Sequence, residues 1–167
     1  MIFKFKKHNH NLYNILLTLS RNILFYNKIR LPDTFETRIY LMFIHFSILM
    51  LISKKKGSKF DQKYYDFFFH NIEYNLRELG FGDVSVNKKM KEFNKILYDI
   101  LLKIHLDEIS QNQLKINHKL ICKYFNELKD PKNLRYLDFE RYFTNFFDFC
   151  FKLPLENMVK EVINFKN

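Results

Sequence analysis

Residues that break or reverse a chain are scarce in this sequence, whose 167 residues include only 3 glycines and 3 prolines. A fold of many short strands needs such residues at its tight turns, so their scarcity argues against one. Long apolar runs are also missing. The uncharged run 39–53 has 15 residues, whereas a membrane-spanning helix needs roughly 20 apolar ones. We therefore expect this run to form a buried core helix.

Signatures of metal binding and catalysis are lacking as well. Cys122 and Cys150 match no zinc-ligand spacing, and without a signal peptide they predict reduced, buried thiols rather than a disulfide. The histidines form no His-Glu-x-x-His motif, and the pair His70/Glu73 reverses the Glu-x-x-His order of di-iron bundles. We expect no metal, no cofactor and no catalytic activity.

Positive charge is what the chain has in excess, with 28 Lys and Arg against 18 Asp and Glu and a formal net charge of +10. Such an excess attracts polyanions: RNA, a ribosome surface or an anionic bilayer. The basic residues are spread along the chain and no nucleic-acid reader motif occurs, so we expect no DNA contact. A basic helical adaptor for ribosomes or RNA is the alternative function. Lys4, Lys6 and Lys7 suggest a transit peptide, but such peptides are rich in Arg and Ser.

Apolar residues recur at steps of three and four along most of the chain, which is the pattern of amphipathic helices. Seven helical segments are expected, at about residues 12–26, 34–54, 59–79, 83–104, 111–128, 134–152 and 155–165. The second is apolar nearly all round, as a helix surrounded by others should be. The sequence predicts an all-α fold: a single domain over residues 1–167, with six to seven helices around a buried central helix at about 34–54.

Several helix ends can be predicted from capping chemistry. Asp33 is expected to cap the second helix, with Glu36 three residues on completing a capping box. Gly57 should end that helix, and Gly80 should supply the left-handed residue that follows the third. Gly82 is expected to be a second permissive joint, after which Asp83 or Ser85 caps the fourth helix.

Three segments share a specific order and spacing. The first joins Leu-Tyr at 12–13, Ser-Arg at 20–21 and Phe-Tyr at 25–26 to Leu-Pro-Asp-Thr-Phe-Glu-Thr-Arg at 31–38 and His45. The second joins Asp-Phe-Phe at 66–68 to Asn-Leu-Arg-Glu-Leu-Gly-Phe-Gly-Asp at 75–83, and the third is Val-Asn-Lys-Lys-Met-Lys at 86–91. Together they resemble the ubiquinol–cytochrome c chaperone family, with Ile72-Glu73 where the family tends to carry Met-Asp. The resemblance covers about 12–103, whereas the extension at about 111–165 is similar only in its helical character.

The resemblance implies a non-catalytic assembly factor for respiratory complex III. Mitochondrial members act with a small partner protein near the ribosomal tunnel exit and hold nascent cytochrome b until it receives haem. For this chain the resemblance implies cytochrome b as client, with a ribosome, a small partner protein or peripheral membrane contact as further partners. Because the match begins about ten residues from Met1, little room is left for a presequence. We expect a bacterial member at the cytoplasmic face of the inner membrane, or the matrix side if the protein is eukaryotic.

The motif residues suggest a polar cluster. Arg38 and His45 are seven residues apart and so share a helix face. We hypothesise that they meet charged residues around the glycine turn and brace it against the second helix. The alternative is that Arg38 pairs with Glu78 while His45 is a core imidazole with an ordinary partner. The predicted cluster comprises Asp33, Thr34, Arg38, His45, Arg77, Glu78, Gly80, Gly82 and Asp83.

Two surfaces are candidates for partner contacts. Lys88, Lys89 and Lys91 form either a solvated face or a contact for an acidic partner or lipid headgroups. Most aromatic residues follow helical stripes and belong to the core. A chaperone for a membrane protein needs exposed apolar area, and the aromatic residues that fall off the stripes or in the turn could supply it. These are Tyr65, Phe69, Phe81, Phe149 and Phe151.

Overall fold

The computed structural model describes residues 10–110 and 112–167, and helices make up most of this part of the chain. The helices are α1 (His10–Ser20), the π-helix η1 (Leu24–Lys28), α2 (Phe35–Lys55), α3 (Gln62–Glu78), α4 (Asp83–Lys103), α5 (His118–Tyr124), the 3-10 helix η2 (Asn126–Leu128), α6 (Leu134–Lys152), α7 (Leu155–Glu161) and the 3-10 helix η3 (Val162–Asn164). Two strands, β1 (Ile104–Asp107) and β2 (Gln113–Ile116), form a hairpin. The all-α prediction is confirmed. Lys4, Lys6, Lys7 and Gln111 lie outside the described residues.

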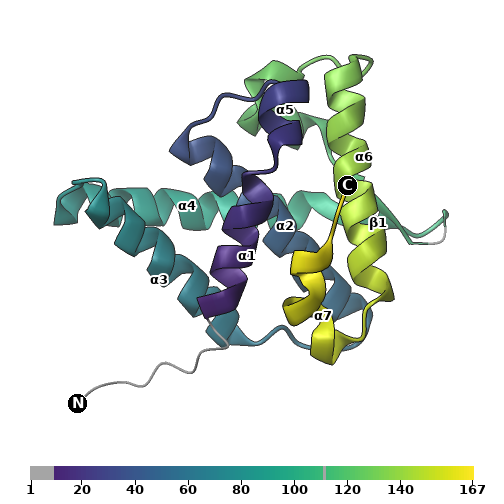
Figure 1. The fold of residues 1–167 in the computed structure, drawn as a ribbon, viewed down its shortest axis with the longest axis horizontal. Helices are drawn as coiled ribbons and strands as arrows, with labels where there is room; N and C mark the ends of the chain where they lie inside the picture. Colours follow the sequence, from purple (N-terminus) through teal and green to yellow (C-terminus); the bar gives the residue numbers. More distant parts are fainter. Residues whose placement is uncertain (1–9, 111) are drawn as a thin grey trace.

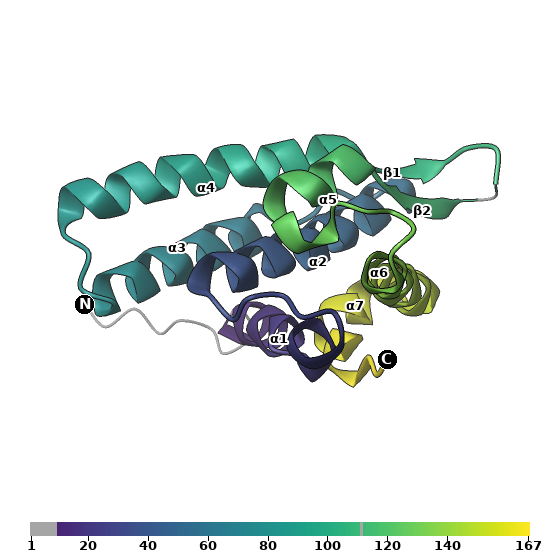
Figure 2. The same ribbon diagram turned by 90° about the horizontal axis from the view of Figure 1, so that it is seen from above.

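Helix α2 occupies the centre, with α1, α4 and α6 packed around it (Figures 1 and 2). Every residue from 41 to 49 is buried, which explains why this helix is apolar nearly all round. By length and composition α2 could also cross a membrane, but 67% of its apolar window is buried by the rest of the protein. A core helix passes the same test, and burial favours that interpretation.

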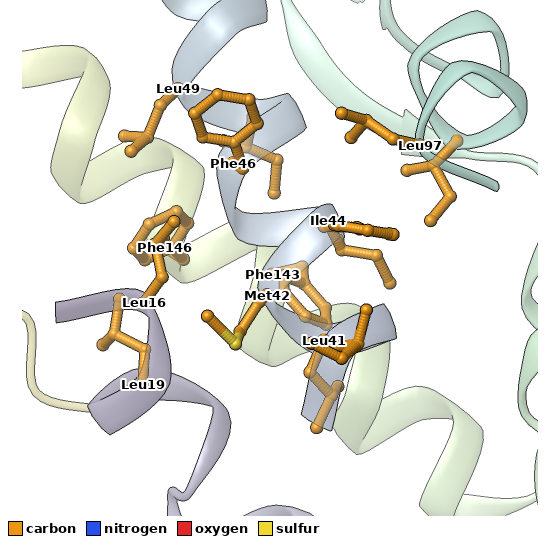
Figure 3. Close-up of a cluster of buried hydrophobic side chains, with 14 of the residues drawn as sticks. Leu16, Leu19, Leu41, Met42, Ile44, Phe46, Leu49, Leu97, Phe143 and Phe146 are labelled. Carbon is orange, nitrogen blue, oxygen red and sulfur yellow. The ribbon is translucent and has the colours of Figure 1, made fainter. Parts of the chain in front are cut away.

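The core around α2 draws on both ends of the chain. Figure 3 shows Leu16 of α1, Met42 of α2 and Phe143 and Phe146 of α6 gathered in one cluster, and all four are fully buried. On the opposite side of α2, Phe43 contacts α3 and α4 through aromatic rings. Burial of this kind contributes about 25 cal/mol per Å² of apolar surface, so the core supplies most of the stabilising free energy.

The first predicted helix is interrupted. It was expected to run to about residue 26, but α1 ends at Ser20 and a separate π-helical turn begins at Leu24. The side chain of Asn22 accepts a hydrogen bond from the Leu24 amide at 2.9 Å. Such local side-chain bonds compete with helical ones, because they offer the amide another partner.

The cap of α2 is one residue later than predicted. Thr34, not Asp33, is the N-cap, and its hydroxyl oxygen accepts a hydrogen bond from the Thr37 amide at 3.1 Å. Asp33 instead lies 3.4 Å from Nε of Arg38, and Glu36 lies 3.7 Å from Lys89 of α4. The predicted capping box is therefore wrong. An N-cap oxygen bonds the amide two or three residues on, and two adjacent capping residues compete for that role.

Two glycines end helices as predicted. Gly57 follows α2 with φ +74° and Gly80 follows α3 with φ +91°. At the end of α3, the Gly80 amide bonds the Arg77 carbonyl at 3.0 Å and the Phe81 amide bonds the Leu76 carbonyl at 3.2 Å, which is the Schellman pattern. Gly82 has φ −74° and is itself the N-cap of α4, so Asp83 is the first helical residue rather than the cap. The expected cap at Asp83 or Ser85 is therefore wrong.

Replacing Gly80 with alanine is expected to lower the free energy of unfolding by about 1 kcal/mol, because a Cβ atom is disfavoured at positive φ. Nothing lies within 4 Å of the added Cβ, so the cost is conformational rather than steric. Asparagine tolerates this backbone region better, and Gly80→Asn should cost less than Gly80→Ala. Urea unfolding of the three proteins checks the order, and equal costs for Ala and Asn would contradict it.

The expected helix at 111–128 is wrong over its first half. Strand β1 pairs with β2 in antiparallel register, with Ile104 opposite Ile116 and Leu106 opposite Leu114. In both strands apolar and polar residues alternate, so the apolar side chains share one face. Helix α5 begins only at His118, after Asn117, whose side chain accepts a hydrogen bond from the Lys119 amide.

Candidate functional site

The predicted polar cluster does not form as one group, because Arg77 and Asp83 pair across the glycine turn but Arg38 and His45 have other partners. Arg38 pairs with Asp33, and Arg77 pairs with Glu73 at 3.0 Å and with Asp83. His45 lies inside the protein and contacts α6 instead. Seven residues along a helix correspond to a rise of about 10 Å, so a shared face does not bring Arg38 and His45 to the same neighbours. The hypothesis of one brace is therefore wrong.

His45 is the core imidazole of the alternative interpretation. It is fully buried, its Nδ1 atom lies 2.6 Å from the Leu41 carbonyl oxygen, and its Nε2 atom lies 2.9 Å from the Tyr142 hydroxyl oxygen. A carbonyl oxygen can only accept, so Nδ1 donates and Nε2 accepts from Tyr142. Burial lowers the pKa of His45 to about 4, only partly offset by the bond to Leu41. The imidazole is therefore neutral and its polar atoms are satisfied.

A cleft of about 290 Å³ opens between α1, α2 and α3. Apolar side chains from α1 and α2 contribute Leu17, Phe35, Ile39 and Met42. The remaining lining residues are polar or lie at a helix end: Tyr13, Arg21, Arg38, Asn75, Glu78 and Leu79. The cleft thus combines apolar surface with charged groups of both signs.

The charged groups of the cleft surround the Tyr13 hydroxyl, which accepts a hydrogen bond from the Asn75 amide. Burial raises the pKa of Tyr13, while the Asn75 bond and the charges of Arg21 and Arg38 lower it and Glu78 raises it. Within the described ranges neither Arg21 nor Glu78 has an ion-pair partner, so the predicted Arg38–Glu78 pair is wrong. Both groups can pair with charges on a ligand.

Both ring nitrogens of His45 form hydrogen bonds inside the core, so they cannot bind a ligand, whereas the Arg38 guanidinium can. Its Nε atom lies 3.3 Å from the Thr34 carbonyl oxygen and 3.4 Å from Asp33, which anchors the side chain from one edge. The side chain is 29% exposed. An arginine fork held by its Nε still presents two terminal nitrogens, which suit a carboxylate.

Two of the three segments that carry the family resemblance meet at this cleft, whereas the third, at 86–91, contributes no lining residue. Seven lining residues belong to the first two: Tyr13, Arg21, Phe35, Arg38, Asn75, Glu78 and Leu79. Sequence reasoning placed only Arg38 and Glu78 in a site and missed the others. Their presence in the quoted segments was the available signal, but nothing in the sequence indicates that α1 and α3 meet beside the start of α2.

The aromatic residues proposed as client surface divide into two groups. Phe69 is buried and stacks on Phe43 of α2, so its assignment to the surface is wrong. Tyr65, Phe149 and Phe151 are half-buried against the core, and Phe81 is 38% exposed in the α3–α4 turn. Phe69 faces inward because α3 contacts α1, α2 and α4, so its buried face is wider than one stripe.

The three lysines that were candidates for partner contacts differ in exposure. Lys88 and Lys91 are exposed, whereas Lys89 is half-buried, lies 3.7 Å from Glu36, and sits over the Phe81 ring at 5.0 Å. Lys89 therefore links α4 to α2. Tyr13, Arg21, Arg38 and Glu78 remain the polar groups best placed to bind a ligand.

Chemically the cleft can hold an apolar side chain together with a charged group.

The residues described by the structure contain no cluster of three or more His, Cys, Asp or Glu that could hold a metal ion. Cys122 is half-buried beside His118, with Sγ 3.4 Å from Nε2, and Cys150 is buried, so the two cysteines are free thiols.

Comparison with known proteins identifies the family. The family model described as ubiquinol-cytochrome C chaperone matches residues 27–115, more than half of the chain. This match covers α2, α3, α4, β1 and all but the last residue of β2. It includes seven of the ten cleft residues: Phe35, Arg38, Ile39, Met42, Asn75, Glu78 and Leu79. No curated protein and no solved structure matches the chain. A match over more than half of the chain shows that the chain belongs to the ubiquinol–cytochrome c chaperone family.

Proposed function

We propose that this complex III assembly chaperone binds newly made cytochrome b through the α1–α2–α3 cleft. The observation that supports the proposal is that the first and second motif segments together line one amphipathic cleft. Cytochrome b as client comes from the family resemblance, and the cleft offers a surface with suitable chemistry. Holding the client in this way requires no covalent step.

The size of the cleft limits what it can hold. Ligand pockets span about 300–1,000 Å³, so a volume of about 290 Å³ accommodates one or two side chains rather than a membrane helix. We expect one apolar side chain of the client to contact Leu17 and Phe35, the half-buried apolar residues of the lining. A neighbouring carboxylate would then reach Arg38. The cleft anchors a short segment of the client, and other surfaces cover the rest.

We expect the protein to act at the cytoplasmic face of a bacterial inner membrane, or at the matrix side in a eukaryote. Newly made cytochrome b is available there before the complex is assembled. A ribosome or a small partner protein can assist without changing the role of the cleft.

Arg38→Ala is expected to reduce recovery of cytochrome b with the tagged chain by about thirtyfold, the loss typical of a central arginine in an interface. Stability should change little, because the ion pair that Arg38 forms with exposed Asp33 is worth little at a surface. Recovery is measured by affinity purification from detergent-solubilised cells of the source organism, followed by mass spectrometry. Thermal melting of the purified variant tests its fold.

Arg77→Ala is the matched control. It removes an arginine that also forms surface ion pairs but lies outside the cleft. This variant should recover cytochrome b as the wild type does. Full recovery with Arg38→Ala, or a preparation of the wild type in which cytochrome b is absent, would contradict the proposal.

A further inference from the structure

Helix α4 carries an outward-facing stripe of six residues, spaced alternately four and three apart. The stripe consists of Val84, Lys88, Lys91, Lys95, Tyr98 and Leu102, and all six are exposed. This spacing keeps them on one face of a helix, opposite the buried residues Phe93, Ile96, Leu97 and Ile100. Figure 2 shows α4 along one edge of the molecule, with α2 and α3 on its inner side.

The three lysines of the stripe have no acidic partner. In the described part of the chain, no ion pair involves Lys88, Lys91 or Lys95. In α4, which the structure describes throughout, two acidic residues border the stripe: Glu92 is exposed and forms no ion pair with Lys88 or Lys95, and Asp99 pairs with Lys103 and Lys123 instead. The centre of the stripe is therefore a free positive surface.

The two ends of the stripe are apolar and unusually open. Val84 is 84% exposed and Leu102 is 82% exposed, while Tyr98 is 57% exposed. The hairpin that follows α4 continues beyond its C-terminal end in Figure 2, and Ile109 in its loop is 96% exposed. Removing side chains as exposed as these from water into an apolar environment is favourable.

We infer that the α4 stripe is the face by which the protein rests on an anionic lipid bilayer. Lys88, Lys91 and Lys95 contact the headgroup phosphates, and Val84, Tyr98 and Leu102 reach the boundary of the acyl chains. Tyrosine suits this boundary because its ring is apolar and its hydroxyl stays in the polar layer. The inference goes beyond the proposed function, because it names a second surface that does not touch the cleft.

A bilayer fits this stripe better than RNA or a partner helix does. RNA phosphates would satisfy the lysines but leave Val84 and Leu102 in water. A partner helix would bury three lysine charges at the centre of its seam, which is costly without a matching carboxylate for each. A bilayer accepts both kinds of residue at once, because lysine stems extend from apolar surface to the headgroups.

Binding of the full-length chain to vesicles tests the inference. We expect binding to vesicles of phosphatidylcholine and phosphatidylglycerol in equal amounts, weakening as salt is added, and little binding to phosphatidylcholine alone. The triple variant Lys88→Glu, Lys91→Glu, Lys95→Glu should bind at least about a hundredfold more weakly, since each lysine contributes about a fivefold factor. The single variant Lys91→Glu, about fivefold weaker, replaces the triple if the triple does not fold.

A triple variant with the same change in net charge is the control. Lys152, Lys160 and Lys166 are exposed and lie in or beside α6 and α7, away from α4 (Figure 2). Their replacement by Glu should leave most of the binding intact. Equal loss in the two triples, equal binding to both kinds of vesicle, or RNA binding through the α4 lysines without vesicle binding would overturn the inference.

A fluorescent reporter tests the apolar end of the stripe. The sequence contains no tryptophan, so Leu102→Trp introduces a single emission signal. We expect its emission to shift to shorter wavelength with anionic vesicles. The emission of Ile163→Trp, a site 54% exposed on η3, should not shift. Cytochrome b recovery in detergent should be unchanged by the α4 triple, so a failure here is distinguishable from a failure of the proposed function.

Discussion

Phe43→Ala is expected to lower the free energy of unfolding by about 3–5 kcal/mol, the usual cost of removing a fully buried aromatic side chain. Phe43 is 0% exposed at the centre of α2. The centroid of its ring lies 5.7 Å from that of Phe68, 5.8 Å from that of Phe69 and 6.2 Å from that of Phe93. Alanine would leave a cavity among α2, α3 and α4, because rings held by three helices cannot all move inward. Urea unfolding followed by circular dichroism measures the change.

Phe60→Ala serves as the control for this prediction. Phe60 is half-buried before α3, where its ring lies 5.4 Å from both Phe46 and Tyr64. Because water already reaches part of this ring, the loss should be about 1–2 kcal/mol. Domains are stable by only about 5–15 kcal/mol, so Phe43→Ala should visibly populate unfolded protein in mild urea. A Phe43 variant no less stable than the Phe60 variant would show that α2 is not the centre of the core.

Acidification is expected to remove about 3 kcal/mol of stability through His45 alone, as pH falls from about 6.5 to about 4. Burial lowers the pKa of this imidazole from 6.5 to about 4. Below pH 6.5 the unfolded chain therefore binds a proton that the folded chain excludes, and stability falls until the folded protein also binds it near pH 4. Protonated Nε2 would have to donate to Tyr142, and the charge would sit among aromatic rings, with Phe143 and Phe146 centroids 4.9 and 4.8 Å away.

His45→Gln separates this effect from other acid-sensitive groups. Burial opposes ionisation of Asp99, but hydrogen bonds from Lys103, Lys123 and Tyr124 outweigh it and lower the pKa of that carboxyl. The stability that Asp99 contributes is present above its unfolded pKa of 3.8 and is lost at lower pH. The free energy of unfolding of His45→Gln should therefore be nearly flat from about pH 6.5 to about pH 4. A slope equal to that of the wild type would contradict the role of His45.

Helices marked by one uninterrupted pattern of apolar residues could be predicted with nearly correct ends. Helix α6 was expected at about 134–152 and is found there, because an aromatic stripe at helical spacing lies between Asp130-Pro131 and Pro154. The buried α2 and the left-handed Gly57 and Gly80 were also predicted correctly. In each case the information is local, since periodicity and backbone freedom depend on neighbours in sequence.

Features that depend on distant contacts were missed. The hairpin has four residues in each strand, too few for alternation to outweigh the helical pattern on either side. Lys89 was grouped with Lys88 and Lys91, but Glu36 and Phe81 draw it inward. The cleft is the most important feature that the sequence did not predict, because Arg21, Arg38 and Glu78 come together only when α1 and α3 pack against α2. Tertiary contact decides these positions, and spacing alone does not encode it.

The burial of His45 against α6 has a consequence for the evolution of this chain. The family match ends at residue 115, yet Tyr142, Phe143 and Phe146 of α6 complete the environment of α2. A protein truncated after the matched region would expose one whole side of its central helix to water. Substitutions at these C-terminal positions are therefore limited to side chains that keep this side of the central helix out of water.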